Sequence, residues 1–215
     1  MTKLVAPSIL SGDFADMAKS CLDAKTWGAD ILHLDVMDGV FVPNITFGMP
    51  MVKALKARNI LPLDVHLMIT KPEKYVGQFC DCGADIVTFH PDASDDVAGA
   101  LKIIKDKGVK CGLVLNPDKP LELVRPYLDD IDVLLIMSVY AGFGGQKFIP
   151  ESLDKLKQAK KLIEGKNVLL EVDGGVDETN AKDILACGVD IMVAGSAVYK
   201  SENPSKTIKI LRGEI

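Results

Sequence analysis

A short phrase that recurs along the chain sets the strongest limit on its fold. The phrase is a glycine followed by Ala or Val, then Asp and Ile, and it stands at residues 28–31, 83–86 and 188–191, with a weaker copy at residues 108–111. In each copy the glycine can end a helix in the left-handed conformation, and the apolar residues after it can begin a strand. The first and second full copies lie 55 positions apart, and the second and third 105. These spacings are multiples of roughly 27 residues, so we expect repeated helix-and-strand units.

Strands and helices are expected to alternate along the whole chain at this spacing. One eighth of the 215 residues is about 27, the length of one strand-plus-helix unit. Most expected strands are runs rich in Leu or β-branched residues, as strands buried on both faces should be. They fall at residues 4–9, 31–36, 63–68, 86–90, 111–115, 133–139, 168–173 and 191–196. Helices are expected at residues 13–26, 72–82, 95–107, 151–163 and 178–186.

Eight strands that alternate with helices, with no linker between them, predict an α/β fold in which residues 1–215 form a single (β/α)8 TIM-barrel domain. An open, doubly wound parallel sheet is the alternative. That fold often carries a Gly-x-Gly-x-x-Gly turn after its first strand, where this chain has Ala-Pro-Ser-Ile-Leu at residues 6–10. The barrel is therefore the preferred fold.

Composition and charge exclude several classes of protein. Hydrophobic residues make up 48% and charged residues 26% of the chain, a mixture typical of globular rather than disordered proteins. The net charge of -5 argues against a nucleic-acid partner, because proteins that bind phosphate backbones are normally basic. No apolar run approaches the ~18 residues of a membrane span, and residues 1–7 show no signal-peptide core. Five cysteines, an odd number, argue against a disulfide framework, so we expect a cytoplasmic protein.

Polar side chains gather at the ends of three expected strands. His33 and Asp35 share the inward face of the second strand, His66 lies on the third, and Asp173 ends the seventh. In a (β/α)8 barrel the carboxyl ends of the strands form the active face. Two imidazoles and two carboxylates there suit one divalent metal ion, Zn²⁺, Fe²⁺, Mn²⁺ or Co²⁺. A cation would also cancel the repulsion between the two carboxylates.

Three further polar residues lie beside this cluster. Asp64 and Glu171 are one inward step, ~6.6 Å, deeper along their strands. They are interpreted either as acceptors that orient the metal-binding histidines or as paired polar groups in the layers of the barrel interior. His90, at the end of the fourth expected strand, is interpreted as a wall or core histidine.

Glycine-rich turns follow the last three expected strands and predict a phosphate site. Backbone N–H groups in such turns and at helix N-termini bind phosphate without any lysine. Barrels often hold phosphate in this region. The residues concerned are Gly142, Gly144, Gly145, Gly174, Gly175, Gly195 and Ser196.

At these motifs the chain closely resembles the ribulose-phosphate 3-epimerase family. The resemblance rests on the order and spacing of residues 6–10, 33–44, 64–68, 142–150, 171–175 and 193–197. It extends from about residue 4 to about residue 200. It implies a (β/α)8 barrel with one divalent metal ion that interconverts D-ribulose 5-phosphate and D-xylulose 5-phosphate. A small-molecule sugar phosphate is then the expected partner, and we also expect a homo-oligomer.

The resemblance also implies roles for individual residues. His33, Asp35, His66 and Asp173 would hold the metal, and Asp35 and Asp173 would form the catalytic acid/base pair. Ser8 and His66 would contact the sugar, and the glycine turns with Ser196 the phosphate. The substrate-binding residues implied are Ser8, His66, Gly142, Phe143, Gly144, Gly145, Asp173, Gly174, Gly175, Gly195 and Ser196.

Inversion at C3 of a ketopentose phosphate requires removal of a proton from one face and delivery to the other. Because C3 neighbours the C2 ketone, the intermediate is a cis-enediolate, and one carboxylate must face each side of it. The second and seventh strands lie on opposite parts of a barrel wall, so Asp35 and Asp173 satisfy this requirement. By resemblance, Asp35 takes the proton from ribulose 5-phosphate and Asp173 supplies the other.

The chain departs from the family pattern at three positions. Tyr140 and Ala141 stand where the family usually has an acidic residue or Asn followed by Pro, and Asp92 stands where it usually has Glu. Without proline the loop at residue 141 is expected to be less rigid.

Three other functions share part of this pattern. A D-allulose 6-phosphate 3-epimerase would use the same site on a hexose. A non-catalytic sugar-phosphate-binding barrel would keep the glycine turns but would not need both aspartates. A lysine-dependent barrel enzyme would need a lysine at the carboxyl end of a strand, and no expected strand has one there.

Overall fold

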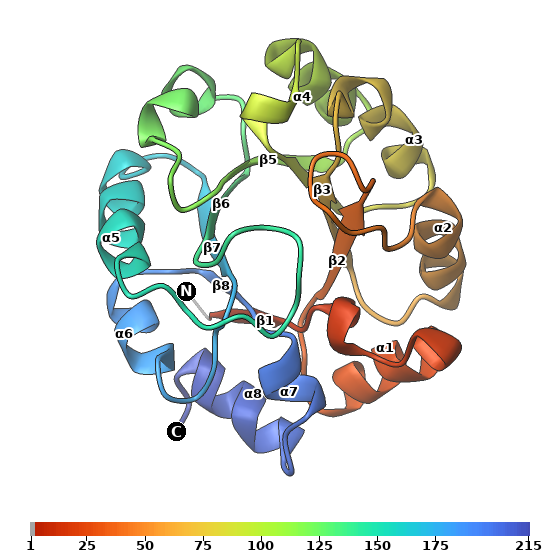
Figure 1. The fold of residues 1–215 in the computed structure, drawn as a ribbon, viewed down its shortest axis with the longest axis vertical. Helices are drawn as coiled ribbons and strands as arrows, with labels where there is room; N and C mark the ends of the chain where they lie inside the picture. Colours follow the sequence, from red (N-terminus) through yellow and green to blue (C-terminus); the bar gives the residue numbers. More distant parts are fainter. Residues whose placement is uncertain (1–2) are drawn as a thin grey trace.

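Eight parallel strands form a ring at the centre of the computed structural model, which describes residues 3–215 (Figure 1). The strands are β1 (Leu4–Ala6), β2 (Leu32–Met37), β3 (Leu63–Met68), β4 (Ile86–Phe89), β5 (Lys110–Leu115), β6 (Val133–Met137), β7 (Leu169–Asp173) and β8 (Ile191–Val193). They pair in the order β1-β8-β7-β6-β5-β4-β3-β2. The predicted (β/α)8 barrel is confirmed. The expected strands at residues 4–9, 133–139 and 191–196 end early, because the chain leaves the ladder there to form the loops of the barrel mouth.

Helices surround the ring. They are α1 (Met17–Thr26), α2 (Met49–Arg58), α3 (Val76–Asp81), α4 (Val97–Asp106), α5 (Ser152–Leu162), α6 (Ala181–Ala186), α7 (Ser196–Tyr199) and α8 (Pro204–Arg212). Between β5 and β6 the chain forms only two 3-10 turns, Leu121–Leu123 and Arg125–Tyr127. Prolines 117, 120 and 126 explain this, because proline lacks the N–H that a helix interior requires. None of the helices within residues 3–215 combines the length and the hydropathy needed to cross a membrane.

The ring is closed between β1 and β2 by a short contact rather than by a full ladder. Ser8, just beyond β1, forms an isolated parallel bridge with His33 of β2. The His33 N–H donates to the Pro7 carbonyl at 3.1 Å, and the Asp30 N–H donates to the Val5 carbonyl at 3.0 Å. The seam of the barrel therefore runs through two residues that the sequence singled out for function.

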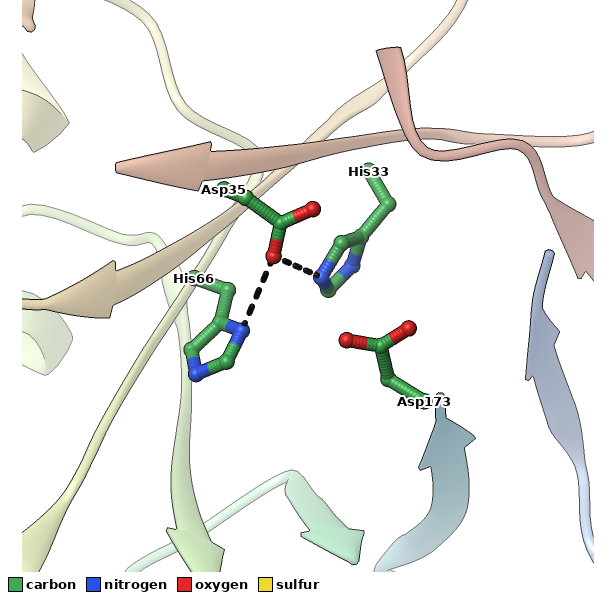
Figure 2. Close-up of side chains that lie close together, drawn as sticks. All are labelled: His33, Asp35, His66 and Asp173. Carbon is green, nitrogen blue, oxygen red and sulfur yellow. Dashed lines mark hydrogen bonds and ion pairs between the residues drawn. The ribbon is translucent and has the colours of Figure 1, made fainter. Parts of the chain in front are cut away.

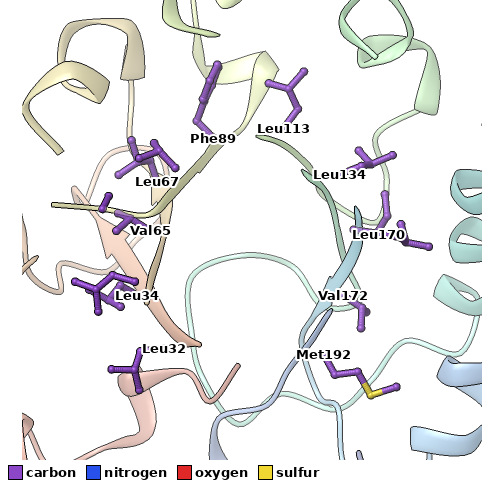
Figure 3. Close-up of a cluster of buried hydrophobic side chains, with 14 of the residues drawn as sticks. Leu32, Leu34, Val65, Leu67, Phe89, Leu113, Leu134, Leu170, Val172 and Met192 are labelled. Atoms are coloured by element: carbon purple, nitrogen blue, oxygen red, sulfur yellow. The ribbon is translucent and has the colours of Figure 1, made fainter. Parts of the chain in front are cut away.

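Apolar side chains fill the layer between strands and helices. Leu32 and Leu34 of β2, like Val65 and Leu67 of β3, point outward from the ring (Figure 3). The period-two geometry of a strand then turns the alternate residues inward. Further apolar residues of the strands, several of them at the amino ends, form a separate buried cluster of Ala6, Ile31, Ile86, Val133, Ile191 and Val193.

The recurring Gly-x-Asp phrase has a structural explanation. Its glycines end helices with positive φ, 99° at Gly28 and 97° at Gly83, as expected. Its aspartate precedes an even-numbered strand and accepts the N–H of a residue near the start of the preceding odd-numbered strand. The aspartate-to-nitrogen distances are 2.9 Å for Asp30 to Val5, 2.8 Å for Asp85 to Leu63 and 3.0 Å for Asp190 to Leu170. Before β6, where the glycine of the phrase is absent, Asp132 accepts the Cys111 N–H in the same way at 2.9 Å. The aspartate contact therefore recurs once in every two strand-plus-helix units. This explains why the copies of the phrase are separated by two or four units.

Asp190 gives a test of this interaction. Its carboxylate also accepts from Lys3 at 3.1 Å and from Lys160 at 2.7 Å. We expect Asp190→Ala to lower the free energy of unfolding by about 2 kcal/mol, because it leaves a backbone N–H unpaired and removes charge-assisted hydrogen bonds. Urea denaturation measures the change. Asp106→Ala, at an exposed site where only Lys102 is lost, should cost no more than about 0.5 kcal/mol.

The contribution of Asp190 to the free energy of unfolding should also depend on pH. Burial alone would raise the pKa of Asp190, but Lys160, the Leu170 N–H and Lys3 outweigh burial and lower it. A lowered carboxyl pKa stabilises the fold above the unfolded-state pKa, near pH 4, and this contribution is lost as the pH falls. The difference between wild type and Asp190→Ala should therefore shrink below about pH 4. A difference that grows with acid would contradict the assignment.

Candidate functional site

The structure brings four of the predicted site residues together at the carboxyl ends of the strands. His33 and Asp35 come from β2, His66 from β3 and Asp173 from β7 (Figure 2). One ligand atom from each residue lies within 4.8 Å of those of the others, and the four can hold a metal ion. His33 and His66 are fully buried, and Asp35 is 4% exposed. The backbone register pairs Asp35 with His66 across β2 and β3, which places these two side chains side by side.

His33 is oriented by a carboxylate on its inner side. Its Nδ1 lies 2.6 Å from Oδ2 of Asp64, and its Nε2 faces Oδ1 of Asp35 at 3.4 Å. Because a carboxylate only accepts, Nδ1 carries the hydrogen of this bond. Nε2 is buried and has no hydrogen-bond partner within residues 3–215. With its hydrogen on Nδ1, His33 is able to offer the Nε2 lone pair to a cation held among these carboxylates.

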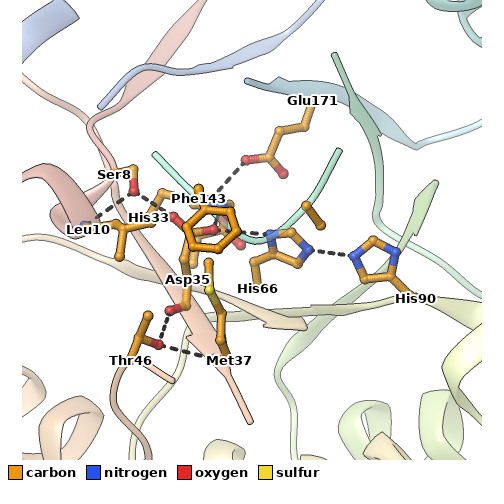
Figure 4. Close-up of polar contacts among 12 residues, drawn as sticks. Ser8, Leu10, His33, Asp35, Met37, Thr46, His66, His90, Phe143 and Glu171 are labelled. Carbon is orange, nitrogen blue, oxygen red and sulfur yellow. Dashed lines mark hydrogen bonds and ion pairs between the residues drawn. The ribbon is translucent and has the colours of Figure 1, made fainter. Parts of the chain in front are cut away.

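Asp35 is held by contacts to its side chain and its backbone. The Ser8 hydroxyl donates to Oδ2 at 2.6 Å, and His66 Nδ1 lies 3.3 Å from Oδ1 (Figure 4). The Asp35 carbonyl also accepts from the Thr46 hydroxyl at 2.6 Å. These contacts fix the carboxylate at the floor of the site. Two imidazole nitrogens, from His33 and His66, and two carboxylates, from Asp35 and Asp173, are a set of ligands that suits a divalent cation.

Two more carboxylates lie beneath the cluster. Asp64 and Glu171 are fully buried, and with His33 they form a second group of possible ligands. Oε1 of Glu171 is 3.5 Å from His33 Nδ1, and neither carboxyl oxygen of Glu171 has a hydrogen-bond partner within residues 3–215. Burial and the Asp64 carboxylate raise the pKa of Glu171 well above its usual value. Asp64 thus acts as the acceptor for His33, one of the two roles considered for it from the sequence.

The two outer carboxyl groups have pKa values shifted in opposite directions. Burial alone would raise the pKa of Asp35, but His33 and His66 outweigh burial and hold it well below its usual range. Burial and the neighbouring Asp35 charge raise the pKa of Asp173 to about 7. For His33, burial alone would lower the pKa, but Asp64 and Asp35 hold it well above its usual value. Among the protein's own groups, Asp35 is therefore ionised at neutral pH, whereas the pKa of Asp173 lies close to neutral pH.

A pocket opens above the cluster at the barrel mouth. Asp35 and Asp173 line it together with Ser8 and Ser196, and no lysine or arginine lies among its lining residues in the described part of the chain. Met37, Met68 and Met137 form its apolar wall. The predicted glycines and Phe143 also line it, namely Gly142, Gly144, Gly145, Gly174, Gly175 and Gly195. The structure therefore brings the predicted phosphate and carboxylate residues to one pocket, with His33 and His66 below its surface.

Glycine is required by geometry at two of these positions. Gly175 has φ +64°, and a Cβ there would lie 2.3 Å from the Phe148 backbone nitrogen. Gly174 has φ +121°, and a Cβ there would lie 2.8 Å from the Val139 backbone nitrogen. Ser196 begins α7, so its backbone N–H has no partner inside the helix. These turns keep backbone close to the pocket, as the phosphate prediction requires.

The loop after β6 crosses the barrel mouth in Figure 1 and is anchored by side-chain amides. The Asn44 amide donates to the Gly142 carbonyl at 2.9 Å, and the Gln146 amide donates to the Tyr140 carbonyl at 2.7 Å. The Ala141 N–H donates to Oδ1 of Asn116 at 3.3 Å. Proline could not make this last bond, so the alanine that was expected to loosen the loop also gives it an anchor. The sequence carried no sign of the Asn116 contact, because residues 116 and 141 follow different strands.

His90 has a contact that the sequence analysis missed. It is fully buried, as expected of a core histidine, but its Nε2 lies 3.0 Å from Nε2 of His66 (Figure 4). The signal was available in the alternation of the fourth strand, which turns Thr88 and His90 inward beside His66.

The fold and the site define a (β/α)8-barrel enzyme with a candidate metal centre at the carboxyl ends of its strands. Residues 4–199 match the model of the ribulose-phosphate 3 epimerase family. The chain belongs to this family.

Relatives with assigned names agree with the family. Ribulose-phosphate 3-epimerase of Bacillus subtilis is 46% identical over 212 residues, which cover 97% of this chain and 98% of that protein. Ribulose-phosphate 3-epimerase of Escherichia coli K12 is 46% identical over 215 residues, covering 99% of this chain and 96% of that protein. Among solved structures, 3-keto-L-gulonate-6-phosphate decarboxylase from Vibrio cholerae superposes with a TM-score of 0.77 at 16% identity, covering 100% and 97% of the two chains. At that identity the likeness concerns the fold alone.

Cation binding can be measured on the metal-stripped protein by its thermal midpoint. At 100 times its dissociation constant a ligand stabilises the fold by about 2.7 kcal/mol, which for a chain of this size raises the midpoint by roughly 5 to 10 °C. We expect Zn²⁺ or Mn²⁺ to produce this shift in the wild type and in Asp106→Asn. Asp173→Asn should lose most of it. An equal shift in Asp173→Asn would argue that the cation binds elsewhere.

Proposed function

We propose that the chain is a ribulose-phosphate 3-epimerase that interconverts D-ribulose 5-phosphate and D-xylulose 5-phosphate. One observation carries the proposal: two carboxylates, the buried Asp35 from β2 and the half-buried Asp173 from β7, meet at the floor of one glycine-lined pocket. Family membership and the 46% identical relatives that bear this name support the reaction and its substrate.

The reaction needs two proton-transfer groups on opposite faces of C3. Removal of the C3 proton next to the C2 ketone leaves a cis-enediolate, and return of a proton to the other face inverts the carbon. We assign Asp35 as the base when ribulose 5-phosphate is the substrate and Asp173 as the acid, with the roles exchanged in the reverse direction. The Ser8 hydroxyl, 2.6 Å from Oδ2 of Asp35, keeps that carboxylate turned toward the pocket.

We assign the metal to His33 Nε2, Asp35, His66 Nδ1 and Asp173. Both nitrogens face Oδ1 of Asp35, at 3.4 and 3.3 Å. Nitrogen and carboxylate donors in these numbers suit Zn²⁺, Fe²⁺, Mn²⁺ or Co²⁺. A divalent cation bound there supplies a Lewis acid for the oxygens of the reacting sugar, an effect worth several kcal/mol.

The remaining residues bind and enclose the sugar phosphate. We assign the phosphate to the backbone of the turns at residues 142–145, 174–175 and 195–196, which line the pocket without a charged side chain. Phe143, half-exposed on the loop after β6, would cover the sugar. The apolar methionine wall, Met37, Met68 and Met137, keeps water from the reacting face.

Three expectations about the setting of this activity stay predictions. They are that residues 1–215 form a single domain, that the protein is a homo-oligomer and that it works in the cytoplasm.

An epimerase assay in D₂O tests the two-base assignment. Metal-loaded wild type should place solvent deuterium at C3 of the product in every turnover. Asp173→Asn should lose epimerisation by at least about 10³-fold, because the second face has no donor, yet it should still exchange the C3 hydrogen of ribulose 5-phosphate through Asp35. Nuclear magnetic resonance of recovered substrate and product measures both.

The variant must be shown to retain its metal, because Asp173 is also an assigned ligand. With metal retained, full epimerisation by Asp173→Asn would mean that another group serves the second face. Product free of deuterium would favour a single base that returns the same proton. Turnover of D-allulose 6-phosphate under the same conditions separates the pentose from the hexose reaction, and we expect the pentose to be preferred.

Gly144→Val tests the phosphate assignment. A Cβ at residue 144 would have no neighbour closer than 3.8 Å, so the larger side chain fits the fold and enters the pocket instead. We expect KM to rise at least about tenfold, a loss of ~1.4 kcal/mol in substrate binding. Lys147→Ala, which removes a lysine of the adjoining surface groove, should change KM by less than about threefold. The reverse order would indicate a side-chain clamp.

A further inference from the structure

His90 forms a hydrogen bond with His66, a proposed metal ligand, on the side of the ring away from Asp35. Its Nε2 lies 3.0 Å from Nε2 of His66, and the two rings are 5.1 Å apart between centroids. The opposite nitrogen of His66, Nδ1, faces the carboxylate of Asp35. His66 therefore lies between the metal site and His90, one nitrogen turned to each (Figure 4).

Two imidazole nitrogens at this distance share one hydrogen. With no hydrogen the two lone pairs would repel, and with two the N–H groups would collide, so one ring donates and the other accepts. Because both rings are fully buried, water does not compete for this bond. The direction of the bond therefore decides which nitrogen of His66 keeps a lone pair.

A cation on Nδ1 of His66 determines that direction. Nδ1 must then offer its lone pair, so the hydrogen of His66 lies on Nε2 and is donated to Nε2 of His90. His90 in turn must carry its own hydrogen on Nδ1, an atom that is buried and has no hydrogen-bond partner within residues 3–215.

We propose that His90 is a positioning residue, which accepts the hydrogen bond of His66 and thereby holds that ring in the tautomer and orientation that bind the cation. The inference rests on the metal-dependent function proposed above. It gives each imidazole ligand a partner on its far nitrogen: Asp64 accepts from His33, and His90 accepts from His66. Such partners typically contribute 10- to 100-fold to metal affinity.

The surroundings keep His90 in place. The ring of Phe41 packs against it at 4.7 Å between centroids, and the next residue, Pro91, begins the 3-10 turn Pro91–Ala93. Thr88, two residues earlier on β4 and also turned inward, is equally buried, but its hydroxyl has no hydrogen-bond partner within residues 3–215. Thr88 therefore provides a matched control: a buried polar group on β4 that does not hold a ligand.

The test compares three variants in a Zn²⁺ titration of metal-stripped protein against a chromophoric chelator. His90→Phe keeps a ring for Phe41 but offers no acceptor, and we expect its affinity for Zn²⁺ to fall roughly 10- to 100-fold. His90→Gln offers its amide oxygen to His66 and should recover affinity to within about threefold of wild type. Thr88→Val should bind Zn²⁺ like wild type. Equal affinities for His90→Phe and wild type would overturn the proposal.

A second measurement needs no variant. The chain has only three histidines, so the ring nitrogens of all of them can be assigned by ¹⁵N nuclear magnetic resonance. In the Zn²⁺-loaded wild type we expect hydrogen on Nε2 of His66 and on Nδ1 of His90. Hydrogen on Nε2 of His90, with none on Nε2 of His66, would overturn the proposal even if the variants fail to fold.

The two proposals fail differently. If wild type binds Zn²⁺ tightly and epimerises ribulose 5-phosphate while His90→Phe binds it equally well, the role of His90 is wrong and the function stands. If wild type binds no divalent cation but epimerises the sugar, the metal site is wrong and the role of His90 falls with it.

Discussion

The burial of charge inside the barrel is the constraint on which the rest of the structure depends. Seven ionisable side chains of the described residues lie inside the ring around the candidate site, and five of them, His33, Asp64, His66, His90 and Glu171, are completely buried. An isolated buried charge costs several kcal/mol, so these groups persist only because each faces another. His33 lies between Asp35 on one side and Asp64 on the other, which makes it the central residue of the cluster.

The carboxylates at the two ends of the barrel have different kinds of partner. At the amino ends of the strands, Asp30, Asp85 and Asp190 pair with basic side chains and with backbone N–H groups, and so stabilise the fold. At the carboxyl ends no lysine or arginine lines the pocket within residues 3–215, and Asp35 and Asp173 face imidazoles, the Ser8 hydroxyl and each other. The cluster therefore keeps unbalanced negative charge next to the substrate, which a divalent cation is suited to offset.

The repeat in the sequence was enough to predict the barrel and its inward residues, because strand alternation alone turns His33, Asp35, His66 and Asp173 to one side. It was not enough to predict contacts between loops. Those that anchor the mouth, such as Asn116 to Ala141, join residues that follow different strands, and only the curvature of the closed ring brings them together. His90 was placed correctly in the core, and strand alternation could also have placed it beside His66, but the hydrogen bond between them depends on the rotamers of two rings, which no pattern specifies.

Ser8 contributes both to closure of the barrel and to the position of Asp35, the proposed base. Its backbone bridges His33 across the only seam of the ring that lacks a ladder within residues 3–215, and its hydroxyl donates to Asp35 and accepts the N–H of Leu10. If β1 separates from β2, Asp35 loses its serine partner and His33 loses its backbone contact at the same moment. The proposed base, which His66 and Thr46 also hold, therefore takes one of its contacts from the seam that closes the ring, and this links its position to closure of the barrel rather than to a local loop.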